Sequence, residues 1–354
     1  MRRVIEPPAP TFERDVNVGT FALDCGVTLP DVIQRVSIYG EPRADGSNVA
    51  LVNHALTGSS RVADWWGEIA GPGKLLDTRV LAVVGVNVLG SCYGSTGPAS
   101  LGPDGKPHGS NFPVVSVSDM VRAQRLALGL LGIERLAVVA GGSLGGMQAL
   151  EWTLQAPAQV DRALIVGAYD WFSAFGIALN AVAREAIAIG ATPQAGIELA
   201  RKIAMLTYKS EALLGERHGR KFDRKGGDPT KRASDKFDVE GYLDHQGKLF
   251  SARMDPQAYL VVTRAMDLFD TRDRVLSDLH PAYTFVGITS DWLFLPGYVR
   301  AAAERFAAAG ADSVYLEFVS NHGHDAFLAE PEHLRTLVGP RLASLYSELA
   351  ASVA

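Results

Sequence analysis

The stretch Gly141-Gly142-Ser143-Leu144-Gly145-Gly146 decides the fold class of this 354-residue chain. It follows an apolar run, Leu136–Ala140, with the length and composition of a buried strand, and it precedes a helical stretch, Met147–Gln155. A serine inside G-x-S-x-G between strand and helix is typical of a nucleophile elbow, in which small neighbours allow a strained serine backbone. The alternative is a glycine-rich turn with an incidental serine. The strand and helix on either side favour Ser143 as a nucleophile.

Continuous apolar runs recur along the chain and predict a sheet that is covered on both faces. Helical stretches alternate with them: Met120–Leu131, with Ser118-Asp119 as the expected cap, Met147–Gln155 and Pro296–Ala309. Strand–helix alternation predicts a mostly parallel central sheet with right-handed crossovers, which together with the elbow indicates an α/β-hydrolase fold. The strand-like runs are Ala50–Val52, Val80–Val86, Leu136–Ala140, Ala163–Val166, Thr284–Ile288 and Val314–Phe318.

The first 40 residues differ from this pattern and read as an antiparallel lead-in, Asn17–Leu23 followed by Val32–Tyr39. The alternation also stops between Trp171 and Leu279, where only helices are expected. We expect these helices over residues 172–189, 195–214, 239–250 and 256–269, with a charged, mobile loop over 215–236.

This helical stretch predicts two parts, a catalytic domain formed by residues 1–170 and 280–354 and a helical lid inserted over residues 171–279. Lids shape substrate pockets and exclude water. A dimerisation element is the other interpretation of such an insertion, and both roles are compatible.

Composition limits the classes of partner. The net charge of −5 gives no basic surface for nucleic acid or an anionic membrane. The N-terminal Met1–Pro8 carries charge without an apolar run, and no stretch approaches the roughly 18 apolar residues of a membrane span. A cytoplasmic protein is therefore expected. Its cysteines, Cys25 and Cys92, are expected to be free thiols with structural roles.

A serine nucleophile needs a base and an acid that orients the base, in the chain order Ser, Asp, His for this fold. Asp291 and His324 each follow a strand-like run, so both are expected at the carboxyl edge of the sheet, where sites of open α/β sheets lie. His322 competes with His324 as the base. Two histidines without H-E-x-x-H or a carboxylate cluster do not predict a metal site, so none is expected.

The loop Asn53–Ser59 follows an early strand, where this fold draws its second oxyanion donor. The expected donors are the backbone N–H groups of Leu56 and Leu144. Loss of one such donor typically costs about 2.7–4 kcal/mol of transition-state stabilisation. We expect His54 to be a packed, hydrogen-bonded loop residue rather than a catalytic one.

Four sequence blocks resemble the homoserine O-acyltransferase family, the MetX type of homoserine O-acetyltransferase. The resemblance covers nearly the whole chain, including the helical stretches Phe237–Leu243 and Arg264–Asp267, and the second and third blocks are specific to this family. The blocks are Asn53–Gly58, Asn87–Pro98, Gly141–Trp152 and Gly323–Leu328.

The resemblance implies ping-pong acyl transfer. Ser143 accepts an acyl group from acyl-coenzyme A, homoserine then takes it, and His324 serves as base and acid while Asp291 holds it. It further implies that Arg201 and Tyr208, seven apart on a lid helix, and Asp325 bind the carboxylate and ammonium of the amino acid. It implies acetyl-coenzyme A as co-substrate, no permanently bound cofactor, and a homodimer formed through the lid helices.

The sequence leaves the acyl donor and acceptor open. Ser91 stands where acetyltransferases usually carry glycine, and Leu89–Cys92 resembles the serine O-succinyltransferase branch, whereas Gly141–Trp152 resembles the acetyl branch. Transfer of acetyl to L-homoserine is our main hypothesis, and serine or homoserine O-succinyltransferase is its alternative. A carboxylic-ester hydrolase would use the same triad. A non-catalytic binding protein would not need Ser143, Asp291 and His324 intact.

Overall fold

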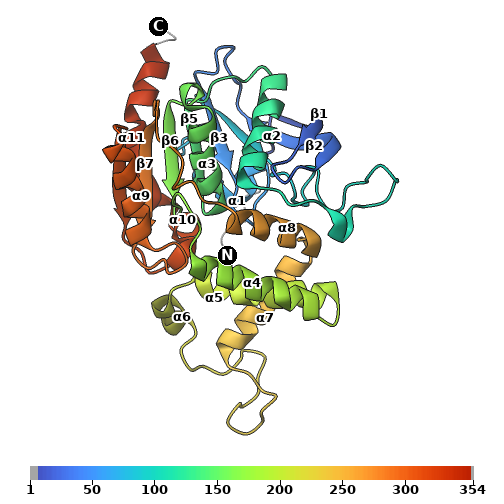
Figure 1. The fold of residues 1–354 in the computed structure, drawn as a ribbon. Coiled ribbons are helices and arrows are strands. Elements are labelled where there is room, and N and C mark those ends of the chain that lie inside the picture. Colours follow the sequence, from blue (N-terminus) through green and yellow to red (C-terminus); the bar gives the residue numbers. More distant parts are fainter. Residues whose placement is uncertain (1–6, 352–354) are drawn as a thin grey trace.

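One eight-stranded sheet organises the computed structural model, which describes residues 7–351 (Figure 1). Met1–Glu6, part of the charged N-terminal stretch without an apolar run, lie outside the described residues. The strand order is β1-β2-β4-β3-β5-β6-β7-β8. The strands are β1(Phe12–Ala22), β2(Thr28–Tyr39), β3(Val49–Asn53), β4(Ala82–Val86), β5(Val138–Gly142), β6(Arg162–Val166), β7(Ala282–Ile288) and β8(Ser313–Phe318).

Strands β3 to β8 run parallel, and β1 and β2 add an antiparallel pair at one edge. The central strands β3, β4 and β5 are buried along their whole length, because helices cover both faces. The mostly parallel sheet predicted from the apolar runs is confirmed. The lead-in strands β1 and β2 are longer than predicted.

Two helical layers enclose the sheet. Helices α2, α3 and α9 pack on one face, and α1 and α11 pack on the other, where Trp66 and Leu345 join the core. Helices α1 and α11 were not predicted from the sequence. In the described part of the chain, no helix is both long and apolar enough to cross a membrane. These helices are α1(Val62–Trp66), α2(Val117–Leu130), α3(Leu144–Gln155), α9(Pro296–Ala308), α10(Ala326–Ala329) and α11(Pro331–Ala351).

The cap of α2 lies earlier than predicted. Ser116, not Ser118, is the N-cap residue, and its hydroxyl accepts a hydrogen bond from the Asp119 N–H at 2.9 Å. The Asp119 carboxylate accepts in return from the Ser116 N–H at 2.9 Å. This reciprocal capping box satisfies two backbone donors at once, which explains why the helix begins at Val117.

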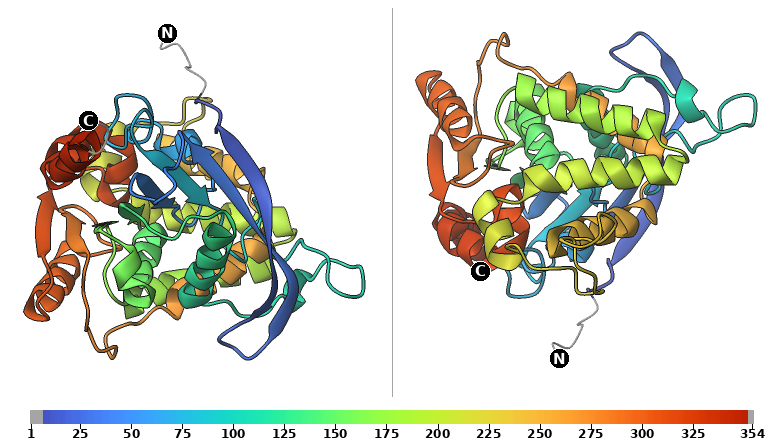
Figure 2. Two further views of the ribbon diagram at one scale, coloured as in Figure 1. Left: turned by 90° about the horizontal axis from the view of Figure 1, so that it is seen from above. Right: turned by 90° about the horizontal axis from the view of Figure 1, so that it is seen from below.

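Five helices between β6 and β7, here called the cap helices, lie beyond the carboxyl edge of the sheet (Figure 1). Seen from below, α4 and α5 run side by side across this edge (Figure 2). The two ends of the segment are joined, since Phe172 N–H donates to the Phe269 carbonyl at 2.9 Å. The cap helices are α4(Ala174–Ile189), α5(Pro193–Tyr208), α6(Glu211–Arg217), α7(Asp238–Ser251) and α8(Pro256–Asp267).

The single helix predicted over residues 195–214 is wrong, because α5 ends at Tyr208 and α6 starts at Glu211. The Ser210 hydroxyl accepts from the Leu213 N–H at 3.1 Å and so caps α6. The same hydroxyl donates to the Asn321 carbonyl. The break therefore ties the cap helices to the chain that follows β8.

Candidate active site

Ser143 occupies the turn between β5 and α3 in a strained conformation, with φ 59° and ψ −128°. Such a backbone costs about 1–3 kcal/mol and persists only where its surroundings hold it. Its N–H donates to the Val166 carbonyl on β6 at 3.0 Å. A Cβ at Gly145 would lie 2.1 Å from the Asn53 carbonyl oxygen. Glycine is thus required for the elbow to approach the end of β3, and the turn presents Ser143 at the carboxyl edge.

Asp291 and His324 meet at the same edge, as predicted from their positions after strands. Asp291 follows β7, and His324 lies in the short turn Gly323–Asp325 after β8. The His324 Nδ1–H donates to Asp291 Oδ2 at 2.6 Å, and both side chains are buried. The other oxygen, Oδ1, accepts from the N–H groups of Leu293 at 2.9 Å and Phe294 at 2.8 Å. Asp291 therefore holds His324 in the tautomer whose Nε2 is free to accept a proton.

The His324 ring is fixed by aromatic packing close to the elbow. It stacks on Phe294, with ring centroids 5.0 Å apart, and meets the edge of Phe327. A Cβ at Gly167, which directly follows β6 beside the elbow, would lie 3.3 Å from His324 Cε1. Nε2 is buried and has no hydrogen-bond partner within residues 7–351. Such a nitrogen is suited to take a proton from a hydroxyl that enters the site.

Charges around His324 set its proton affinity. Burial by itself lowers the pKa of the imidazole, but the charge and hydrogen bond of Asp291 outweigh it, so the pKa of His324 lies above its usual value of 6.5. Asp325 raises this pKa further and Lys209 lowers it. The imidazolium that forms after proton uptake is therefore stabilised in the site.

His322, the competing histidine, lies in different surroundings. Its Nδ1 is 3.4 Å from a carboxylate oxygen of Glu330, and its Nε2 is 3.3 Å from Arg217 on α6. The geometry therefore supports His324 as the base.

The expected oxyanion donors come from two neighbouring elements. Leu144 is the first residue of α3, and Leu56 lies in the loop after β3. His54 holds this loop, because its Nδ1–H donates to the Ala55 carbonyl at 2.8 Å and its Nε2 accepts from the Val88 N–H at 3.1 Å. Burial lowers the pKa of His54 to about 4, so the ring is neutral. As expected from the sequence, His54 is a packed loop residue.

A buried chain of side-chain hydrogen bonds supports the same loop and was not predicted. Trp152 Nε1 donates to Gln124 Oε1, and Gln124 Nε2 donates to Gln148 Oε1, each at 2.7 Å. Gln148 Nε2 donates to the His54 carbonyl at 3.2 Å and the Leu144 carbonyl at 3.3 Å. These hydrogen bonds thus link both segments that carry the expected oxyanion donors. The sequence offered no signal for this chain, because Gln124 and Gln148 lie on different helices.

Arg201 and Tyr208, on α5, lie together at the mouth of the site. The Arg201 guanidinium carbon is 5.3 Å from the Tyr208 ring centre, and that ring is 5.9 Å from the His324 ring. Burial raises the pKa of Tyr208, so its hydroxyl stays protonated. Arg201 Nε is buried without a hydrogen-bond partner among the described residues. Arg201 is therefore a half-buried cation with capacity for an anionic group.

Asp325, the third predicted substrate-binding residue, already has a cation beside it. Lys209 Nζ lies 2.8 Å from Asp325 Oδ2, and both side chains are largely buried. Lys209 stands in the break between α5 and α6, where a Cβ on Gly323 would approach the Ser210 nitrogen to 2.7 Å. Lys209 was not among the predicted site residues, because a continuous helix was predicted over residues 195–214.

Two cavities lead to these residues. A cleft of about 730 Å³ lies between the cap helices and the loop after β3, and its lining includes Arg61, Trp65, Arg201 and Arg253. Arg253 spans it by donating to the Thr57 carbonyl and the Tyr93 hydroxyl, each at 2.8 Å. A second cavity, of about 20 Å³, is lined by Ser143, Leu56 and Tyr208 with apolar cap residues.

The described residues contain neither a metal-binding cluster nor a disulfide. Within residues 7–351 no set of three or more His, Cys, Asp or Glu side chains is arranged to hold a metal ion. Cys25 is exposed and free, and Cys92 is a free thiol whose Sγ lies 3.6 Å from the Met254 sulfur. Burial raises the pKa of Cys92, which disfavours the reactive thiolate.

The elbow, the His–Asp pair and the sheet order together define an α/β-hydrolase-fold protein with Ser143 as its candidate nucleophile. Residues 49–331 match the family model of the alpha/beta hydrolase fold. A homoserine O-acetyltransferase from Haloferax prahovense is 40% identical over 98% of this chain and 92% of its own length. The chain belongs to the homoserine O-acetyltransferase family within this fold, which confirms the resemblance found in its sequence.

Further relatives mark the range of this family. A homoserine O-succinyltransferase from Laribacter hongkongensis is 39% identical over 93% of this chain and 94% of its own length. The solved structure of a homoserine O-acetyltransferase from Staphylococcus aureus has a TM-score of 0.76 at 28% identity, covering 94% of this chain and 95% of its own. Two acyl donors thus occur among relatives of similar identity.

Proposed function

We propose that this enzyme transfers an acetyl group from acetyl-coenzyme A to the hydroxyl of L-homoserine through an acetyl-Ser143 intermediate, a step of methionine biosynthesis. The observation that carries the proposal is the buried Asp291–His324 hydrogen bond beside a strained serine elbow. The names of the relatives support the substrates.

The first half-reaction acylates the serine. Ser143 Oγ attacks the thioester carbonyl while His324 Nε2 takes the hydroxyl proton, and the N–H groups of Leu56 and Leu144 stabilise the oxyanion. The carbon–sulfur bond then breaks, and His324 gives its proton to the departing coenzyme A thiolate. The products are acetyl-Ser143, free coenzyme A thiol and neutral His324.

The second half-reaction reverses these roles with a different hydroxyl. His324 takes the proton of the homoserine hydroxyl, whose oxygen attacks the acetyl carbonyl. The bond to Ser143 Oγ breaks, and His324 returns the proton to that oxygen. Exclusion of water by the cap helices favours this transfer over hydrolysis, which is the alternative reaction of the same triad.

The size of the cavity at Ser143 supports acetyl as the group that is transferred. About 20 Å³ is roughly the space of one water molecule, so the walls must move slightly to admit a two-carbon acetyl group and would have to move much further for a four-carbon dicarboxylate. The larger cleft, with Arg61 and Arg253 in its lining, suits the anionic coenzyme. No permanently bound cofactor takes part in this mechanism.

The amino acid acceptor is proposed to bind at the inner end of the cleft. The Arg201 guanidinium pairs with its carboxylate, Tyr208 packs beside it, and Asp325 receives its ammonium group. Since Lys209 pairs with Asp325 in the structure, the ammonium of the acceptor shares or replaces that contact. This arrangement sets the acceptor hydroxyl toward His324.

The proposal extends to domain organisation and assembly. Residues 171–279 act as a lid on a catalytic domain formed by 1–170 and 280–354. A cytoplasmic homodimer forms through the lid helices, and an apolar stripe on α4 supports this contact. Phe175, Val182 and Ile189 recur every seven residues on α4 and are 47%, 53% and 73% exposed.

One set of assays tests the function. Acetyl- and succinyl-coenzyme A are each mixed with homoserine, serine or no acceptor, and thiol release is followed together with the acylated products. We expect fast turnover only with acetyl-coenzyme A and homoserine, and an added acetyl mass on Ser143 when the acceptor is omitted. Ser143→Ala should lose both. Faster transfer of succinyl, or thiol release independent of acceptor, would favour the succinyltransferase or hydrolase alternative.

A further inference from the structure

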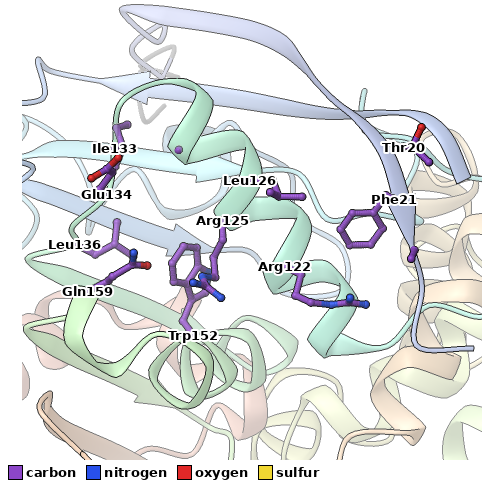
Figure 3. A pocket seen from close by; sticks show the side chains of 12 residues that line it. Thr20, Phe21, Arg122, Arg125, Leu126, Ile133, Glu134, Leu136, Trp152 and Gln159 are labelled. Carbon is purple, nitrogen blue, oxygen red and sulfur yellow. The ribbon is translucent and has the colours of Figure 1, made fainter. Parts of the chain in front are cut away.

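A groove of about 680 Å³ lies along α2 and shares no lining residue with the cleft described above (Figure 3). Its wall combines the end of β1, one face of α2, the loop before β5 and one side chain of α3. The lining residues are Thr20, Phe21, Ala22, Arg122, Arg125, Leu126, Gly129, Ile133, Glu134, Leu136, Trp152 and Gln159.

The groove is separate from the candidate active site. Leu136 and Gln159 precede β5 and β6, so they mark the amino end of these strands, whereas Ser143 follows the carboxyl end of β5. The five residues of β5 span about 16 Å at 3.3 Å per residue. A molecule bound at this end of the groove therefore does not reach Ser143, which is not among the lining residues.

The two arginines of the groove differ in their partners. Arg122 pairs with Asp24 at 2.8 Å and with buried Asp119, and Figure 3 shows it extended toward Phe21. Arg125, three residues later, is drawn on the side of Trp152 (Figure 3). Within residues 7–351 no carboxylate or hydrogen-bond acceptor pairs with Arg125, and its Nε is buried without a partner. An unpaired buried donor of this kind costs about 1–3 kcal/mol.

We propose that this groove is a second binding site, for a small apolar carboxylate. The carboxylate accepts hydrogen bonds from the Arg125 guanidinium, which presents a fork of donors suited to two carboxylate oxygens. The apolar body packs against Leu126, which is 48% exposed, and against the small exposed parts of Ile133 and Trp152. The volume of the groove lies within the range of small-molecule sites, whose walls are apolar with a few fixed polar groups.

The test uses 3-phenylpropionate as the probe, with 3-phenylpropanamide as its uncharged counterpart, and binding is measured by isothermal titration calorimetry on the full chain. We expect saturable binding of the acid with a Kd below 1 mM, and binding of the amide at least tenfold weaker, since about 1.4 kcal/mol of a charge-assisted hydrogen bond is lost. Equal affinity for the two compounds would overturn the role of Arg125.

Two variants locate the site. Arg125→Met should weaken binding of the acid at least tenfold. Gly129→Phe should abolish it, because a side chain at this helical position starts in open space within the groove and meets no protein atom. Gly339→Phe on α11, which also starts in open space, is the matched control and should bind like the parent. Unchanged affinity in Gly129→Phe would place the probe elsewhere and refute the proposal.

Excess acetyl-coenzyme A distinguishes binding of the probe in the groove from binding in the candidate active site. It should leave the Kd of the probe unchanged, because the groove and the cleft have no lining residue in common. Competition between them would assign the probe to the catalytic cleft and overturn the second site. The proposal stands independently of the acyl-transfer function.

Discussion

Replacement of Asp291 by asparagine should inactivate the base while leaving the fold intact. In the structure Oδ1 accepts from the N–H groups of Leu293 and Phe294 at 2.9 and 2.8 Å. The asparagine should keep its amide oxygen at this position, because the reverse orientation would place its NH₂ group against the two backbone N–H groups. Each N–H left without an acceptor would then cost about 1–3 kcal/mol. The amide NH₂ then faces His324 Nδ1, which must accept, so the ring proton moves to Nε2. Such a ring no longer accepts a proton from Ser143.

The expected loss is about 10⁴-fold in acylation rate, the size associated with the wrong tautomer in a serine triad. At about 1.36 kcal/mol per factor of ten, this is roughly 5.4 kcal/mol of transition-state stabilisation. Single-turnover thiol release from acetyl-coenzyme A measures it without the acceptor. As a comparison, Asp325→Asn removes a carboxylate near His324 but keeps the Asp291 hydrogen bond, and should slow acylation less than tenfold. An Asp291→Asn enzyme with more than a tenth of parental acylation would refute the tautomer argument.

Three other predictions follow from the site. The neutral His324 ring is the active base, so the pH at which acylation reaches half its maximum should lie above 6.5. Because Lys209 lowers and Asp325 raises the pKa of His324, this pH should move higher in Lys209→Met and lower in Asp325→Asn. The pH–rate profiles of thiol release measure these shifts, and shifts in the opposite directions would contradict the prediction. Arg201→Lys should raise the KM for homoserine about tenfold, since an ammonium does not reproduce the guanidinium fork, and should leave the acylation rate within twofold of the parent. Steady-state kinetics measure the KM and single-turnover thiol release measures acylation. Impaired acylation would show that Arg201 binds the acyl donor instead. Gln148→Met breaks the buried amide chain and should lower the free energy of unfolding by about 1–3 kcal/mol, measured by urea denaturation, with an unchanged midpoint as the contrary result.

Sequence alone predicted the fold class and the positions of Ser143, Asp291 and His324 in it. These are local signals. Small residues around Ser143 permit a strained turn, and apolar runs identify strands that are buried on both faces. Because parallel strands end at one edge, residues that follow β5, β7 and β8 come together whatever the details of packing.

Only the tertiary structure decided which additional groups surround these residues. Ser210 reaches the Asn321 carbonyl across 111 residues of chain, which breaks the expected helix and brings Lys209 to Asp325. Gln148 and the His54 carbonyl are 94 residues apart, yet they form one buried hydrogen-bond chain. Such contacts depend on how separate elements dock, and docking depends on close packing of whole surfaces rather than on periodicity within one segment. Local sequence motifs therefore predicted the candidate catalytic residues, whereas long-range packing determined which charged and hydrogen-bonding residues surround them.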